Sequence, residues 1–213
     1  MTGHDHGDPM KLFTRPGTCS LAPDIALREA GIAFELVKVS RHTGKTSDGV
    51  DFMTINSKGY VPALLLDNGE LLTENAALLQ YIADLNPAAK LAPPAGTIER
   101  YRLAEWLAFI NSEVHKGFTP LFVPNAGEDL KQYARGNLTK RVGWLAEHLG
   151  AKSFLLGEQF SVADAYLFVV LTWSPHVSFD LTPWPNLLAF QERVAARPHV
   201  VEAMTAEGLL RRK

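Results

Sequence analysis

The chain has 213 residues, of which 46% are hydrophobic and 21% are charged, and its formal net charge at pH 7 is -2. This composition is that of a globular protein with one large core or two small ones, and it excludes a disordered or fibrous chain. The slightly negative charge offers no basic field for a polyanion, so we predict no nucleic-acid partner. No apolar run reaches the length of a membrane span and no secretion signal is recognisable, so we predict a cytoplasmic protein that does not enter a membrane.

The only cysteine, Cys19, stands between a predicted strand and a predicted helix. It follows the apolar pair Leu12-Phe13 and the strand-breaking pair Pro16-Gly17. Apolar side chains within residues 21–27 then recur with helical spacing. The dipole of a helix start favours an anion, so we predict a lowered thiol pKa and a reactive cysteine. The alternative is an inert, buried cysteine that fills space in the core. One cysteine forms no internal disulfide, which suits a reducing compartment.

Residues 1–9 are polar and show no apolar periodicity, so we predict a disordered leader. Within it, His4 and His6 flank Asp5, but no neighbouring side chain completes a metal coordination sphere. We therefore predict no metal site. Met10 would serve as a start as well as the first residue does.

Residues 10–86 alternate between strand and helix patterns. After the Cys19 helix, Gly31 is a helix stop and residues 33–39 alternate as a strand does. A hairpin is predicted around Asp67-Asn68-Gly69, and Asn75 is predicted to N-cap a helix over residues 76–85. The order βαβ-ββα describes a small mixed sheet with helices.

Residues 87–96 are rich in proline and form the predicted linker, and residues 97–213 form a predicted all-helical domain. Ser161 and Asp164 are spaced as a capping box ahead of an apolar helix. The fold class is therefore α+β with two domains. The helices are predicted at 97–118, 130–149, 162–177 and 186–197, with a short one after His199.

Taken together and in order, eight short motifs resemble the bacterial beta class of the cytosolic glutathione transferases. They cover the chain from Met10 to Leu210 and read Met10-Lys-Leu, Pro16-Gly-Thr-Cys19-Ser-Leu, Ala26-Leu-Arg-Glu-Ala-Gly31, Tyr60-Val-Pro-Ala, Leu72-Thr-Glu74, Glu113-Val-His-Lys116-Gly-Phe, Ser161-Val-Ala-Asp-Ala-Tyr-Leu-Phe168 and Glu207-Gly-Leu-Leu. The resemblance implies a thioredoxin-like glutathione-binding domain at 10–86, a homodimer and a role in detoxification. It also implies glutathione as co-substrate and a small-molecule electrophile as second substrate.

The resemblance assigns glutathione binding to residues of the first domain. Val61, before a cis proline, would pair its backbone with the cysteinyl part of glutathione, and Glu74 would pair with the γ-glutamyl ammonium. Asn75 stands where relatives usually carry a smaller residue, at the helix start that would hold the γ-glutamyl carboxylate. The full set implied is Lys45, Tyr60, Val61, Pro62, Glu74 and Asn75.

The catalytic residues implied are Cys19, His115 and Lys116. Lys116 would stabilise a thiolate on glutathione, and His115 would donate to the sulfur or orient the second substrate. An apolar electrophile pocket would be walled by three aromatic side chains, which are Phe118, Tyr166 and Trp173.

The predicted function is conjugation of glutathione to apolar electrophiles, with Cys19 able to form a mixed disulfide with glutathione. One alternative is a glutathione-dependent thiol–disulfide oxidoreductase or reductive dehalogenase, in which Cys19 itself turns over. A second alternative is a non-catalytic ligand-binding protein that uses the same fold as a scaffold.

Overall fold

The computed structural model describes residues 9–210. The predicted disordered leader therefore lies, apart from Pro9, outside the described residues. Within residues 9–210, no helix is both long enough and apolar enough to cross a bilayer.

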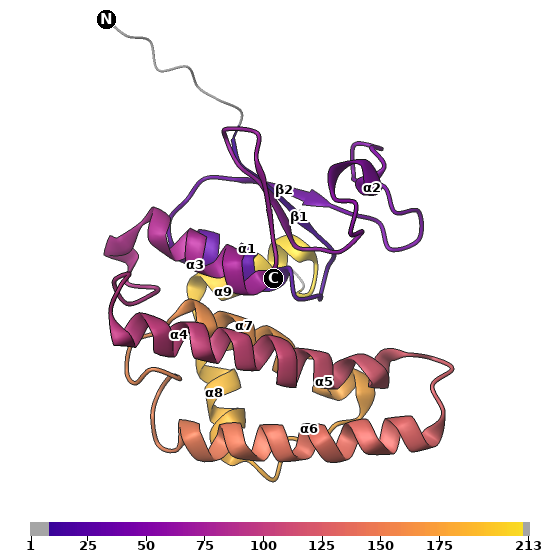
Figure 1. The fold of residues 1–213 in the computed structure, drawn as a ribbon, viewed down its shortest axis with the longest axis vertical. Coiled ribbons are helices and arrows are strands. Elements are labelled where there is room, and N and C mark those ends of the chain that lie inside the picture. Colours follow the sequence, from indigo (N-terminus) through magenta and orange to yellow (C-terminus); the bar gives the residue numbers. More distant parts are fainter. Residues whose placement is uncertain (1–8, 211–213) are drawn as a thin grey trace, which may run out of the picture.

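A four-stranded mixed sheet forms the N-terminal region (Figure 1). Its strands are β1 (Lys11–Thr14), β2 (Glu35–Lys38), β3 (Ala63–Leu65) and β4 (Leu71–Thr73), in the order β2-β1-β3-β4. β1 pairs parallel with β2 and antiparallel with β3, and β4 closes the hairpin with β3. The predicted βαβ-ββα order is confirmed.

Both faces of the sheet are covered. Successive side chains of the inner strand β1 are buried on opposite faces of the sheet. Leu12 belongs to the main core with α1 (Leu21–Glu29) and α3 (Asn75–Leu85). Phe13 belongs to a small separate core with Phe52, on the short helix α2 (Phe52–Ile55), where the two ring centroids are 5.6 Å apart. Successive residues of a strand point to opposite faces, and this alternation produces the two cores.

Helices make up the C-terminal region (Figure 1). Its first long helical segment changes helix type along its length. α4 (Ile98–Phe109) continues without a break into a π-helical turn, Ile110–His115, then into α5 (Lys116–Phe118) and a 3₁₀ turn, Thr119–Phe122. π-helical turns occur often at functional sites. The single helix predicted at 97–118 is thus continuous but is not α-helical throughout.

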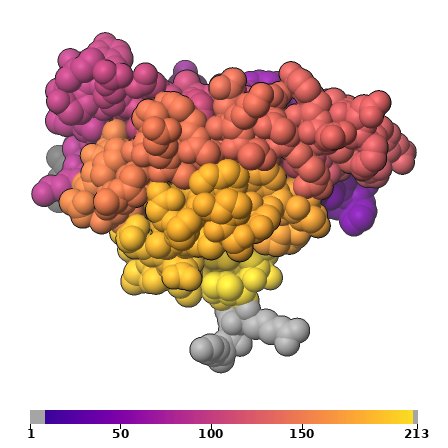
Figure 2. All heavy atoms as spheres, turned by 90° about the horizontal axis from the view of Figure 1, so that it is seen from below, coloured from indigo at the N-terminus to yellow at the C-terminus, as the bar shows by residue number. Residues whose placement is uncertain are grey.

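The remaining helices follow the predicted order with shifted ends. They are α6 (Glu128–Leu149), α7 (Val162–Leu171), α8 (Pro185–Ala195) and α9 (Pro198–Glu207). The prediction of one helix over 162–177 is wrong at its C-terminal end, because α7 stops at Leu171 and a separate 3₁₀ turn, Ser174–Val177, begins with a proline in its first turn. Figure 2 shows a face built by the C-terminal region, orange to yellow, with the N-terminal region behind it.

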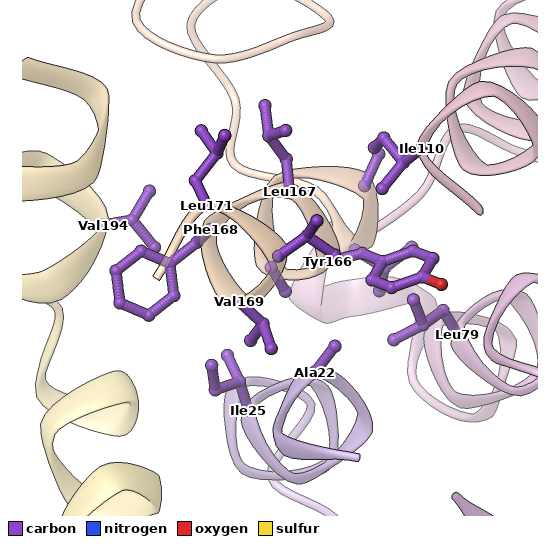
Figure 3. Packing of buried hydrophobic residues seen from close by; sticks show 14 of the residues in the cluster. Ala22, Ile25, Leu79, Ile110, Tyr166, Leu167, Phe168, Val169, Leu171 and Val194 are labelled. Carbon is purple, nitrogen blue, oxygen red and sulfur yellow. The ribbon is translucent and has the colours of Figure 1, made fainter. Parts of the chain in front are cut away.

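α7 is the centre of the main core. All ten of its residues are buried, as expected for a helix that is apolar on every side. Figure 3 shows this helix surrounded by side chains of other elements, namely Ala22 and Ile25 of α1, Leu79 of α3, Ile110 of the π-helical turn and Val194 of α8. The predicted capping box is present at its start, where Asp164 is fully buried.

α9 returns the chain to the N-terminal region and lies beside α1 (Figure 1). Arg28 of α1 forms ion pairs with Asp24 and with Glu202 of α9, both at 2.6 Å. Arg197, just before α9, pairs with Glu29 at 2.7 Å. These contacts bring the end of α9 next to the turn that follows β1.

Candidate active site

Cys19 lies in the turn between β1 and α1, half-buried, with its side chain directed at the loop that precedes β3. Its Sγ donates a hydrogen bond to the Val61 carbonyl oxygen at 3.4 Å, just before the cis Val61–Pro62 peptide bond. The next residue, Ser20, is buried, and its hydroxyl is 2.7 Å from the Thr14 hydroxyl. The thiol is therefore held between the first helix and the loop that precedes β3.

The turn that carries Cys19 is also tied to the C-terminal region. Glu207, at the end of α9, accepts hydrogen bonds from the Thr14 hydroxyl at 2.7 Å and from the Gly17 amide at 2.9 Å. Trp173 donates from Nε1 to the Gly17 carbonyl at 3.0 Å. Gly17 has a φ of 72°, which favours glycine. Burial raises the pKa of Glu207 to about 7.

The predicted lowering of the Cys19 pKa is wrong. Burial raises the pKa of the thiol to about 12, although the nearby charge of Lys116 acts in the opposite direction. A thiolate in this position would lose its contact with water, and the thiol proton is already used in the bond to the Val61 carbonyl. Cys19 is therefore a protonated donor at neutral pH.

We expect the rate of Cys19 alkylation by iodoacetamide to rise about tenfold per pH unit from pH 7 to pH 9, with no plateau. The reason is that only the thiolate reacts, and its population grows tenfold per unit below the pKa. The measurement is the mass gain of the protein with time, with no other thiol present. A rate that levels off near pH 7 would contradict the raised pKa.

A hollow of about 340 Å³ lies between the sheet edge, the start of α3 and the π-helical turn. The structure brings most of the predicted site residues together around it. They are Cys19, Tyr60, Val61, Pro62, Glu74, Asn75, His115, Lys116 and Tyr166. We call it the thiol hollow.

Glu74 and Asn75 lie where β4 meets α3. Glu74 has a φ of 72° and its exposed carboxylate pairs with Lys58 Nζ at 2.7 Å. The prediction that Asn75 caps the helix is wrong, because Asn75 is its first helical residue and its amide Nδ2 instead donates to the Cys19 carbonyl at 3.0 Å. Its Oδ1 is buried and has no hydrogen-bond partner among the described residues. The start of α3 is thus fixed against the Cys19 turn.

His115 ends the π-helical turn and contacts Tyr166 of α7. Its Nδ1 is 2.6 Å from the Tyr166 hydroxyl, which in turn donates to Asn111 Oδ1 at 3.0 Å. With the phenol hydrogen directed at Asn111, Nδ1 is the donor and Nε2 carries the lone pair. Burial, and then the charge of Lys116, lower the pKa of His115 to about 4, so the ring is neutral at pH 7.

A second hollow, of about 560 Å³, lies on the other side of Cys19 and also touches His115. Trp173 and Phe122 form its apolar walls, and we call it the outer hollow. Phe118 does not line either hollow. It is fully buried behind Trp173, with ring centroids 6.0 Å apart, so its predicted place in the pocket wall is corrected to the layer beneath. Tyr166 contributes its polar hydroxyl rather than an apolar wall.

Lys45 is the other predicted residue that lies elsewhere. It lines a third hollow, of about 360 Å³, between the turn after β1 and the loop after β2. That hollow has no lining residue in common with the thiol hollow. Lys45 is therefore not grouped with Val61 and Glu74.

Comparison with known proteins identifies the fold. The family model of the glutathione S-transferase N-terminal domain matches residues 8–84, and that of the C-terminal domain matches residues 109–198. Glutathione S-transferase GstA of Escherichia coli O157:H7 is 46% identical over 94% of this chain and 100% of its own length. The chain belongs to the glutathione S-transferase family.

Two solved structures refine the match to the transferase family. A bacterial beta-class glutathione S-transferase of Sphingomonas chungbukensis is 52% identical with a TM-score of 0.90, over 94% of this chain and 100% of the other. A sphingomonad glutathione S-transferase, solved in complex with glutathione, is 49% identical with a TM-score of 0.90 over the same shares. The predicted beta-class resemblance, fold class and glutathione transferase activity are confirmed.

Five residues of this transferase that line the thiol hollow were not predicted as site residues: Asn56, Lys58, Thr73, Asn111 and Thr119. Asn111 stands four residues before His115, so helical spacing alone could have indicated a shared face. Lys58 reaches the hollow through its pair with Glu74, sixteen positions away in sequence, and no local pattern signals that contact.

Proposed function

We propose that this glutathione transferase conjugates glutathione, through its sulfur, to small apolar electrophiles in the outer hollow. The observation that carries the proposal is the meeting of three features at Cys19: a Val61 amide that donates no hydrogen bond among the described residues, the start of helix α3, and Lys116 with neutral His115. A peptide thiol needs all three, whereas a scaffold that only packs apolar ligands needs none.

The peptide part of glutathione fits the polar side of the thiol hollow. Among the described residues, the Val61 amide has no hydrogen-bond acceptor, so it is available to a peptide carbonyl. The amides of Asn75 and Ala76 open α3 and have no backbone acceptor in residues 9–210, which suits a carboxylate. Glu74 would hold the ammonium. We therefore propose that Tyr60 and Pro62 shape the edge while Val61, Glu74 and Asn75 bind the tripeptide.

The reacting sulfur would lie among Cys19, His115 and Lys116. The Cys19 thiol would turn its single proton from the Val61 carbonyl to the glutathione thiolate, and the ammonium of Lys116 would balance the thiolate charge. Neutral His115 offers its Nε2 lone pair to the departing thiol proton. The thiolate then attacks the electrophile's carbon, and the leaving group exits into the outer hollow, whose walls are Trp173 and Phe122.

The test is glutathione binding by calorimetry together with turnover of 1-chloro-2,4-dinitrobenzene. We expect Cys19→Ala to retain turnover within about tenfold of wild type, because the lost group is one donor among several. Loss of turnover in Cys19→Ala, with glutathione binding intact, would favour a reaction in which Cys19 itself turns over. No binding of glutathione by wild type would overturn the proposal.

A mixed disulfide between Cys19 and glutathione is the second reaction that we propose. The Cys19 thiolate attacks one sulfur of oxidised glutathione, forms the mixed disulfide and releases one glutathione thiolate. Because the thiol pKa is about 12, we expect the adduct to form slowly at pH 7 and about tenfold faster per pH unit above it. Intact mass should show one reversible glutathione on wild type and none on Cys19→Ala. An adduct on Cys19→Ala, or one formed at a rate independent of pH, would contradict this step.

We also propose a cytoplasmic homodimer with domains at 10–86 and 97–213, joined by residues 87–96. Its support is a set of exposed apolar side chains that the described residues leave uncovered: Met53, Tyr60, Ile98 and Tyr101. Large exposed apolar side chains, here on α2, on the loop before β3 and on the first turns of α4, are typical of association surfaces.

A further inference from the structure

The outer hollow adjoins a strongly basic hollow. Pro16 and Arg41 line both, so the two hollows are neighbours on either side of the turn after β1. The neighbouring hollow is the one described above for Lys45, and it is also lined by Arg15, Lys38 and Arg41. We call it the basic hollow.

The cations that line the basic hollow have no ion-pair partner among the described residues. No Asp or Glu lines it, and within residues 9–210 none of its four cations forms an ion pair. The two acids on the adjoining loop, Asp48 and Asp51, accept hydrogen bonds from the Thr46 hydroxyl and the Met53 amide, and the charge of Lys38 acts at longer range on Glu207. In a chain of net charge -2, four cations without an ion-pair partner around one hollow form a local field that attracts an anion.

Arg15, in the lining of the basic hollow, has a guanidinium N–H group that donates no hydrogen bond to the described residues. Its Nε is buried and has no hydrogen-bond partner in the part of the chain that the structure describes. Within residues 9–210, the one hydrogen bond of its side chain is a long one from Nη2 to the Gly59 carbonyl at 3.4 Å. Arg15 therefore adds a cation to the lining of the basic hollow while few protein acceptors engage its guanidinium.

We propose that the basic hollow binds an anionic group of the second substrate, so that the preferred electrophiles are apolar acids, such as aryl compounds with a carboxylate distant from the reacting carbon. This rests on the proposed function. The apolar body would lie against Trp173 and Phe122, and the carboxylate would reach Arg41 and Lys45. The basic hollow shares lining residues with the outer hollow and none with the thiol hollow, which assigns the anion to the electrophile rather than to glutathione.

The test compares two electrophiles that differ only in charge: ethacrynic acid, whose carboxylate is distant from its enone, and its methyl ester. For wild type we expect kcat/KM for the acid to exceed that for the ester about tenfold after correction for their uncatalysed rates. Arg41→Gln and Lys45→Gln should each lower this acid-to-ester ratio about three- to tenfold. Lys152→Gln removes an exposed cation on a distant loop and should leave the ratio unchanged.

Two results would overturn the proposal. One is a wild-type ratio near one, and the other is a ratio unaffected by Arg41→Gln and Lys45→Gln. If those variants raise KM for glutathione instead, the cations serve the tripeptide and the proposal also fails.

Calorimetric titration with the saturated, unreactive analogue of the acid and with its ester separates this proposal from the proposed function, because it needs no turnover. Binding of the acid, weakened by Arg41→Gln, supports the basic hollow even if conjugation is absent, and absence of binding overturns it.

Discussion

Asp164→Ala is expected to lower the free energy of unfolding by about 3 to 5 kcal/mol. The carboxylate is fully buried and accepts three hydrogen bonds: from the Leu155 amide at 2.8 Å, the Ser161 amide at 2.8 Å and the Ser161 hydroxyl at 2.7 Å. Alanine leaves two buried backbone amides without acceptors. They lie at the start of α7, the helix on which the main core is built.

The measurement for Asp164→Ala is urea unfolding followed by far-UV circular dichroism. Ser161→Ala is the matched control, because it removes one hydroxyl from the same capping box and leaves the carboxylate on both amides; we expect it to cost about 1 kcal/mol. A loss below 1 kcal/mol for Asp164→Ala would mean that the amides find other acceptors, which contradicts the role given to this cap.

Lys116→Met is expected to lower kcat/KM for conjugation about 10- to 100-fold with little change in stability. Lys116 is an exposed residue on the rim of the thiol hollow, so its removal leaves no cavity. It is also the cation whose charge acts on the Cys19 thiol and the His115 ring. The glutathione thiolate would lose its balancing charge and become less populated at neutral pH.

The matched control for Lys116→Met is Lys140→Met, which removes an exposed lysine on α6 that does not line the thiol hollow. Initial rates across pH 6 to 9 should show the loss shrinking as pH rises, because alkali restores the thiolate without the lysine. Equal losses in the two variants, or a loss independent of pH, would contradict the assignment.

Local sequence chemistry predicted the features that depend on neighbouring residues. The hairpin follows from Asp67-Asn68-Gly69, and the capping box follows from the spacing of Ser161 and Asp164. The order of strands and helices, and so the fold class, follows from apolar periodicity that changes from alternation to helical spacing after residue 96.

Features set by contacts between distant segments were not predictable. The pKa of Cys19 depends on burial beneath segments far along the chain, which the helix-start argument omits. Glu207 was known only as part of a motif, and its bonds to Thr14 and Gly17 span about 190 positions. Phe118 and Trp173 both fit an apolar wall by residue type, but only the packing decides which ring faces the hollow.

The most direct test of the proposed chemistry is the thiolate absorbance near 240 nm of the enzyme with bound glutathione, titrated from pH 5 to pH 10. We expect a thiolate to appear only with glutathione present, at a pKa at least one unit below the value of about 8.5 for a free cysteine. It should persist in Cys19→Ala and move to higher pH in Lys116→Met. A thiolate that titrates near neutral pH without glutathione, or none with it, would contradict the account.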